Sequence, residues 1–191
     1  MASRPDQPIE IVAYDREWPS RFESERGALE AAIGECAVGG IHHVGSTAIP
    51  GLASKPTIDI LVGVQSLAAS RMCFDSLTAL GYQYAPHLAD EMHWFCKPNP
   101  LLRTHHLHLV PVGSRRYRDE LAFRDHLRAH GDVAAEYAAL KRGLAGRLEH
   151  DREAYTKAKT DFIRTVIEEM AAIDAPNTGD RRGPEPDAIT S

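Results

Sequence analysis

The residues best suited to chemistry in this 191-residue chain are one carboxylate and two imidazoles in two strand-like segments. Asp59 lies in the run TIDILVGV, where isoleucine and valine recur at every second position, so its side chain points away from the most apolar face. His106 and His108 share one face of RTHHLHLV, because side chains two apart on a strand point the same way. Together they would bind a divalent ion or move a proton at neutral pH. We therefore predict Asp59, His106 and His108 as catalytic and metal-ligating residues, provided that the two strands are neighbours.

A Gly-Ser turn at the end of another predicted strand is the second candidate site. Gly45 and Ser46 would let the backbone approach a phosphate and offer it N–H groups and a hydroxyl, although an ordinary turn has the same sequence. Lys55 and Arg103 would either satisfy the Asp59 carboxylate or offset the charge of that phosphate. The four residues are thus predicted as a phosphate-binding set beside Asp59.

Plainer interpretations of the same residues remain open. Asp59 and the histidines would also suit a buried polar network that fixes strand register and binds no ligand. In the run AFRDHLRAH, Arg124, Asp125 and Arg128 fit a surface ion-pair ladder on a helix, which we favour over an anion contact by either arginine.

Helices and strands mix up to about residue 112, and only helices are expected after it. We expect helices over 19–33, after Ser66, over 118–130, from 132 and over 152–173, and strands over 37–44, 57–64, 82–85, 92–97 and 103–112. The helix after Ser66 should bury Leu67, Met72, Phe74, Leu77 and Leu80. This order indicates an α+β fold with a short mixed sheet, flanking helices and a C-terminal helical segment.

Length and composition favour one domain, over residues 9–173, with a flexible start over 1–8 and a disordered tail over 174–191. A net charge of −5 argues against a sequence-independent nucleic-acid binder, and no apolar run reaches membrane-spanning length. Cys36, Cys73 and Cys96 are odd in number and widely spaced, so we expect no disulfide framework and a reducing, cytoplasmic location. Oligomeric state is left open.

Several motifs in order resemble one known family, the GrpB family, over roughly residues 9–171. They are IVAYDREWPSRFESE, HHVGSTAIPGLASKPTIDILV, RTHHLHLV, LAFRDHLRAHGDVAAEYAALKRGLA and AYTKAKTDFI. The resemblance implies a nucleotidyltransferase-like fold, in which a Gly-Ser turn precedes a strand with two acids that hold Mg²⁺ against a triphosphate. Gly45, Ser46 and Asp59 match this pattern, whereas Leu61 stands at the position of the second acid.

The resemblance also implies an activity. The chain would be a metal-dependent nucleotidyltransferase-like transferase or ligase that acts on a nucleotide and a small-molecule acceptor. A divalent ion (Mg²⁺, Mn²⁺ or Zn²⁺) and a nucleoside triphosphate are the expected cofactors, with His106 and His108 in place of the missing acid. The alternative is a non-catalytic nucleotide- or coenzyme-binding module with a degenerate site, since some relatives of this domain are fused to dephospho-CoA kinase.

Overall fold

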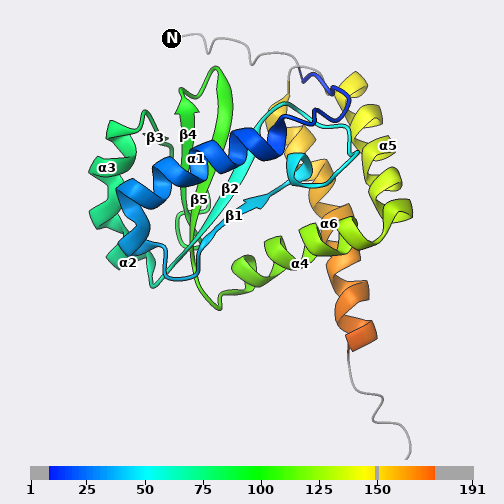
Figure 1. The fold of residues 1–191 in the computed structure, drawn as a ribbon. Helices are drawn as coiled ribbons and strands as arrows, with labels where there is room; N and C mark the ends of the chain where they lie inside the picture. The colour runs from blue at the N-terminus through cyan, green and yellow to red at the C-terminus, as the bar shows by residue number, and fades with distance from the viewer. Residues whose placement is uncertain (1–8, 149–150, 175–191) are drawn as a thin grey trace, which may run out of the picture.

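A five-stranded mixed sheet runs through the computed structural model, which describes residues 9–148 and 151–174 (Figure 1). The strands, in the sheet order β1-β2-β5-β4-β3, are β1 (Ile41–Val44), β2 (Ile58–Val64), β5 (Arg103–Pro111), β4 (His93–Pro98) and β3 (Gln83–Tyr84). Strands β2 and β5 are parallel, and the other three pairs are antiparallel. The predicted α+β class with a short mixed sheet is confirmed.

Six α-helices surround this sheet in the described residues. They are α1 (Trp18–Ile33), α2 (Leu67–Ser70), α3 (Phe74–Ala79), α4 (Arg115–Ala129), α5 (Gly131–Arg147) and α6 (Arg152–Asp174). Short 3₁₀ segments stand at η1 (Gly34–Cys36), η2 (Ser46–Ala48) and η3 (Arg71–Cys73). None of the described helices is both long and apolar enough to cross a membrane. The predicted flexible start and the tail over 175–191 lie outside the described residues, whereas Asp174, expected in the tail, ends α6.

The ends of several helices follow from local chemistry. Pro19 is tolerated in the first turn of α1 because the N–H it lacks would have no partner in the helix. The Ser66 hydroxyl accepts a hydrogen bond from the Ala69 N–H and begins α2, as expected. Ser114 caps α4 in the same way, which explains why this helix begins three residues before the predicted 118.

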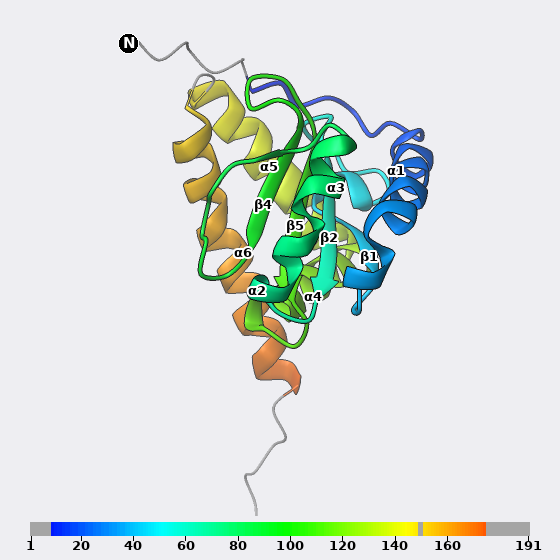
Figure 2. The same ribbon diagram turned by 90° about the vertical axis from the view of Figure 1, so that its left-hand side faces the viewer.

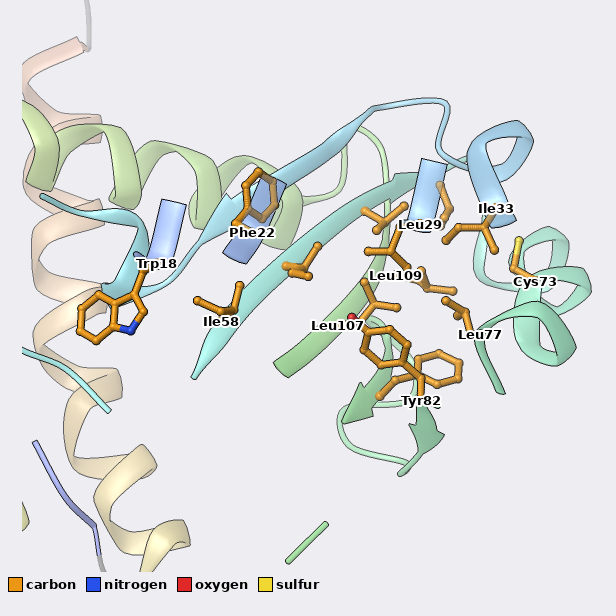
Figure 3. Packing of buried hydrophobic residues seen from close by; sticks show 14 residues of the cluster. Trp18, Phe22, Leu29, Ile33, Ile58, Cys73, Leu77, Tyr82, Leu107 and Leu109 are labelled. Atoms are coloured by element: carbon orange, nitrogen blue, oxygen red, sulfur yellow. The ribbon is translucent and has the colours of Figure 1, made fainter. Parts of the chain in front are cut away.

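One face of the sheet is packed against α1 and α3. Figure 3 shows this core, in which the even-numbered residues of β2 and the apolar residues of β5 meet the two helices. Its buried members include Phe22, Leu29, Ile58, Ile60, Val62, Leu77, Leu107 and Leu109. Burying each such side chain contributes roughly 1.5–3 kcal/mol. Met72 was predicted here, but its side chain points outward and is 73% exposed, because the predicted helix is broken into α2, η3 and α3.

The opposite face of the sheet carries the chemistry. Figure 2 shows α1 on one side of the sheet and the long helices α5 and α6 on the other. On this second face Val44, Leu61 and Val110 pack with Tyr117 and Leu121 of α4. The odd-numbered residues of β2 and the even-numbered residues of β5 share this face, as strand alternation requires. Asp59 therefore points away from the α1 core, as predicted.

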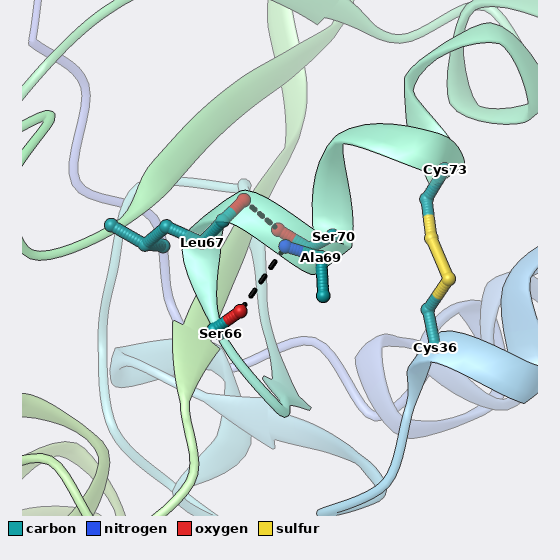
Figure 4. Close-up of a disulfide and its surroundings, with 6 residues drawn as sticks. All are labelled: Cys36, Ser66, Leu67, Ala69, Ser70 and Cys73. Carbon is teal, nitrogen blue, oxygen red and sulfur yellow. Dashed lines mark hydrogen bonds between the residues drawn. A yellow bond between two sulfur atoms is a disulfide. The ribbon is translucent and has the colours of Figure 1, made fainter.

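A disulfide joins Cys36, at the end of η1, to Cys73, at the end of η3 (Figure 4). The sequence-based expectation of no disulfide is wrong for this pair, because η1 and η3 meet beside the α1 core although 37 positions separate the two cysteines. Cys96 is free and buried. The cytoplasmic location that we inferred from cysteine usage stays a prediction.

Candidate functional site

Asp59 and His106 form the centre of the candidate site. They are direct neighbours in the parallel register of β2 and β5, and Asp59 Oδ1 lies 2.8 Å from His106 Nδ1. A carboxylate can only accept, so Nδ1 carries the hydrogen and Nε2 keeps its lone pair. Nε2 is buried and has no hydrogen-bond partner in the described part of the chain. Asp59 thus has an imidazole as a hydrogen-bond partner, and one nitrogen of that imidazole is left to bind something else.

The charge states of this pair suit proton transfer. Burial lowers the pKa of His106, against the opposing influence of Asp59. Burial acts to raise the pKa of Asp59, but the hydrogen bond from His106 and the charges around it bring that pKa below its usual value. At neutral pH the pair is therefore a carboxylate beside a neutral imidazole, which is the state a general base needs.

The Gly-Ser turn lies directly against Asp59. Gly45 has φ +67° and ψ −172°, a conformation that essentially only glycine adopts, and a Cβ at this position would collide with the Asp59 carboxylate. Ser46 begins η2 and interacts through its side chain with Tyr137 of α5. The structure thus brings Gly45, Ser46 and Asp59 together.

His108 occupies the next position along the same face but has a separate partner. Its Nδ1 lies 3.2 Å from Glu120 Oε2 on α4, and Glu120 is also bound by Arg116 at 2.8 Å. Although burial acts to lower it, the pKa of His108 is raised because Glu120 stabilises the protonated ring. His108 is near enough to influence the charge of Asp59, yet its contacts are those of an ion pair beside the centre.

Two lysines from the C-terminal helices face this centre. Lys141 of α5 is 2% exposed, donates to the Ala53 carbonyl at 2.6 Å and has its Nζ 4.8 Å from the centroid of the Tyr137 ring. Lys159 of α6 has its Nζ 4.5 Å from the centroid of the Tyr155 ring. Each lysine interacts electrostatically with Asp59, and Lys141 also with Lys159.

Burial is the main influence on both amines. It lowers the pKa of Lys159, and together with the nearby charge of Lys159 it lowers the pKa of Lys141 to about 7. Two cations held close together in a partly dry site are stabilised by an anion between them. The arrangement therefore suits the phosphates of a ligand placed beside the Gly-Ser turn.

The two cations predicted from sequence lie at the margins of the site. Lys55 has its Nζ 4.3 Å from the centroid of the Tyr155 ring, the ring that Lys159 also contacts. The Arg103 guanidinium lies 5.2 Å from the Trp94 ring centroid, and that ring is 5.0 Å from His106. Their predicted role in phosphate binding stays a prediction.

Arg124 and Arg128 of α4 donate hydrogen bonds to backbone carbonyls, so they do more than form an ion-pair ladder on the helix surface. Arg124 makes the expected ion pair with Asp125, but its guanidinium also donates to the His43 carbonyl at 3.2 Å. Arg128 donates to the Ala48 carbonyl at 3.0 Å. The ladder interpretation is therefore incomplete, because both arginines fix the chain on either side of the Gly-Ser turn.

The side chains present do not fit the Mg²⁺ site with two acids that the resemblance implies. In residues 9–148 and 151–174, no three or more His, Cys, Asp or Glu side chains are grouped so that they could hold a metal ion. Asp59 and His106 hydrogen-bond to each other, and Leu61 gives no second acid. The metal-ligating role of Asp59, His106 and His108 stays a prediction.

Lys141 and Lys159 were missed by the sequence reasoning, although a signal was present. Each lysine follows a buried tyrosine by four residues, Tyr137 and Tyr155, so each lies on the apolar stripe of its helix. A lysine on the buried stripe of an amphipathic helix is unusual unless it has a partner or a ligand. That position was the available evidence for a cationic site.

The sequence of this chain is similar to those of several known proteins. A family model described as GrpB protein matches residues 8–169. The Glutamate-rich protein GrpB of Alkalihalophilus pseudofirmus is 36% identical over 165 residues, which is 84% of this chain and 94% of that protein. The UPF0157 protein YqkA of Bacillus subtilis is 34% identical over 164 residues, or 86% of this chain, which spans only 48% of that relative. A dephospho-CoA kinase of Mycolicibacterium paratuberculosis is 31% identical over 185 residues, covering 82% of this chain and 44% of the kinase.

Solved structures bear on the fold. The crystal structure of the conserved protein GrpB from Enterococcus faecalis has a TM-score of 0.77 and 30% identity, covering 86% of this chain and 98% of that one. The structure of the GLD-2/RNP-8 complex has a TM-score of 0.57 at 14% identity, covering 88% and 70%. Identity this low bears on the fold alone. The predicted nucleotidyltransferase-like fold is thereby confirmed.

Proposed function

The chain belongs to the GrpB family, and we propose that it is a nucleotidyltransferase-like transferase acting on a nucleotide and a small-molecule acceptor. One observation carries the proposal. His106 Nε2 is buried without a hydrogen-bond partner among the described residues, while Nδ1 is held by Asp59 beside the Gly45 turn. A buried imidazole nitrogen with a free lone pair is costly unless a substrate satisfies it.

The nucleotide phosphates would bind at the turn and between buried Lys141 and half-buried Lys159. The turn supplies N–H groups and the Ser46 hydroxyl, and Lys141 and Lys159 supply positive charge. Lys141 gains most from such a ligand, because an anion beside it stabilises the ammonium form that burial disfavours.

The acceptor would lie against His106. In the proposed step His106 Nε2 takes the proton of an acceptor hydroxyl while the acceptor oxygen bonds to the α-phosphorus of a nucleoside triphosphate. The bond from that phosphorus to the β-phosphate bridging oxygen breaks, and diphosphate leaves with the electron pair, its charge offset by Lys141 and Lys159. Asp59 keeps the imidazole in the tautomer that can accept.

A divalent ion carried in on the triphosphate would shield phosphate charge. With Leu61 in place of a second acid, the neutral imidazole takes over the work of the base, and the proposed proton transfer runs through His106 alone.

A second candidate is a binding module without turnover. It is supported by the single acid, Asp59, and by the likeness of this chain to part of a dephospho-CoA kinase. Such a module would bind a nucleotide or coenzyme through Ser46, Lys141 and Lys159 and leave it unchanged. A measurement of nucleotide turnover with a range of small-molecule acceptors distinguishes the transferase from the binding module.

The first experiment is a thermal-shift screen of nucleoside triphosphates and coenzyme A precursors with Mg²⁺, Mn²⁺ or Zn²⁺. A ligand that binds only the folded form raises the melting temperature in proportion to the logarithm of its concentration. We expect a rise with at least one triphosphate, and its loss in Lys141→Met and Lys159→Met.

Lys157→Met is the matched control, because Lys157 is an exposed lysine two residues from Lys159 on the same helix. It should respond to nucleotide as the parent chain does. Unchanged melting temperatures with every nucleotide and ion at millimolar concentration would exclude both candidates.

A further inference from the structure

A groove lies at the edge of the sheet, between α1 and α4. Figure 1 shows β1 running between these two helices. The groove there has a volume of about 430 Å³, and its lining includes Phe22 and Arg26 of α1, His43 of β1, and Arg124 and Arg128 of α4. A volume of this size is typical of small-molecule sites.

This groove is separate from the candidate transferase site. His43 pairs with Ile60 and Val44 pairs with Asp59 in the register of β1 and β2, so His43 and Asp59 point to opposite faces of the sheet. The lining of the groove shares no residue with the candidate transferase site.

One wall of the groove includes two aromatic rings of which little is exposed, 6% of Phe22 and 7% of His43. The rings of His43 and Phe22 stack with centroids 4.7 Å apart and planes 10° apart. Burial lowers the pKa of His43 to about 4, so its ring is neutral at physiological pH. The wall therefore favours the apolar body of a ligand.

The charged groups of the lining are mainly cationic. Arg26, Arg124 and Arg128 face the groove with Glu23 as the carboxylate among its lining residues. On α4 the two guanidiniums share one counter-charge, Asp125, which lies 2.8 Å from Arg124 but 3.7 Å from Arg128. Arg26 is already paired with Glu23 and Glu30, so the positive charge left for an anion is the unmatched one of the two arginines on α4.

Of the two arginines on α4, Arg128 has terminal nitrogens that can bind a ligand. Arg124 uses all three nitrogens, two on Asp125 and one on the His43 carbonyl. Arg128 uses Nε on the Ala48 carbonyl, and within the described residues its terminal nitrogens have no hydrogen bond, only the long contact to Asp125. The side chain is 41% exposed, and its fork matches a phosphate or carboxylate.

We propose that this groove binds a small organic anion, whose phosphate or carboxylate contacts Arg128 and whose apolar body lies on the wall formed by His43 and Phe22. Arg128 also holds η2 through Ala48, immediately after the Gly-Ser turn. An anion on Arg128 therefore acts on the segment that carries Ser46.

The test is a titration of the full chain by nuclear magnetic resonance with three anions: phenyl phosphate, benzoate and inorganic phosphate. Ile41 of β1 also lines the groove. We expect both aromatic anions to shift the Ile41 methyl and Phe22 ring signals at about 1 mM, and inorganic phosphate to bind more weakly. The stronger aromatic anion identifies the charged group that the groove prefers. Benzyl alcohol, an uncharged analogue, should leave these signals in place.

Variants then test the charged contact. Arg128→Gln should weaken binding at least about tenfold, whereas Arg128→Lys, which keeps the charge, should weaken it by about threefold. Arg115→Gln is the matched control, because Arg115 lies on the same helix and is 76% exposed outside the groove. Melting curves check that each variant is folded.

Two results would overturn the proposal. One is the absence of any shift at Ile41 and Phe22 with either aromatic anion in the parent chain, a measurement that does not depend on any variant. The other is equal binding by Arg128→Gln and the parent chain.

Discussion

Lys141 of α5 donates a hydrogen bond to the carbonyl of Ala53, a residue 88 positions earlier in the chain, at 2.6 Å. This contact fixes the helix against the loop that follows the Gly-Ser turn, and it places an ammonium group where water barely reaches. The cost of that position is visible in the pKa of Lys141, which burial lowers to about 7 from an ordinary value of 10.5.

The first prediction concerns stability and pH. Between pH 7 and about 10 the unfolded chain holds a proton on Lys141 that the folded chain has released, so the free energy of unfolding should rise with pH over this range. Lys141→Met should flatten that rise, and urea denaturation at pH 7, 8 and 9 measures it. Lys157→Met should keep the slope of the parent chain; an equal slope in Lys141→Met would contradict the assignment.

Protonation of Lys141 opposes folding, but it should strengthen the binding of an anionic ligand. An anion between Lys141 and Lys159 binds the charged amines, so nucleotide affinity should fall as pH rises above 7. Calorimetric titrations at pH 6.5 and 8.5 test this, with Lys141→Arg, which stays charged, expected to lose most of the dependence. Affinity that is independent of pH in the parent chain would argue against phosphates at these lysines.

A third prediction separates binding from chemistry at the centre. His106→Gln removes the lone pair at Nε2 but leaves the lysines, so nucleotide should still raise the melting temperature while transfer is lost by a factor of about 10²–10⁴. Asp59→Asn should retain binding and lower the rate, since the amide no longer fixes the imidazole tautomer.

The buried-network interpretation gives a different outcome for Asp59. If Asp59→Ala lowered the unfolding free energy strongly and no ligand responded to either substitution, a role in fixing strand register alone would explain the pair.

The fourth prediction uses two glycines with positive φ. Gly51→Ala should cost roughly 1–2 kcal/mol for its φ of +79° alone, because no atom lies near the added Cβ. Gly45→Ala should cost more, since its Cβ also collides with Asp59, and should abolish the nucleotide response. Chemical denaturation of both variants gives the difference; equal losses would mean that the turn can move away from Asp59.

A fifth prediction concerns the bond between Cys36 and Cys73. It closes a loop of 37 residues, so Cys36→Ser with Cys73→Ser should lower the unfolding free energy by about 2–4 kcal/mol. Dithiothreitol should lower the stability of the parent chain by a similar amount and leave the double variant unchanged. Cys96→Ala serves as the control, because it removes the free thiol and keeps the bridge.

The parts of the fold with strict periodicity were predictable. The alternation in TIDILVGV gave the face of Asp59, and the pairing of β2 with β5 brought His106 beside it, as the site prediction required. A serine cap explains the shifted start of α4, at Ser114. Local sequence thus predicted the strands and the long helices but not the break of the helix after Ser66 into α2, η3 and α3, and the residue pairing between strands came from tertiary structure.

Contacts between distant segments escaped prediction for the same reason. Spacing along the chain carries no information about where Cys36 meets Cys73, or about Lys141 reaching Ala53. Glu120 was not singled out because its partner, His108, lies on a strand that precedes its helix, and only packing of α4 on the sheet joins them.

Strand β1 lies at one end of the sheet, and such an outer strand would ordinarily invite a strand of another molecule to pair with it. A side chain of α4 occupies part of that edge instead, because Arg124 donates to the His43 carbonyl of β1, while Tyr117 donates to the carbonyl of Gly39 just before the strand. The opposite end is β3, which has only two residues. Self-association by strand addition is therefore discouraged at both ends, and a substitution that shortens Tyr117 or Arg124 would open a path to aggregation.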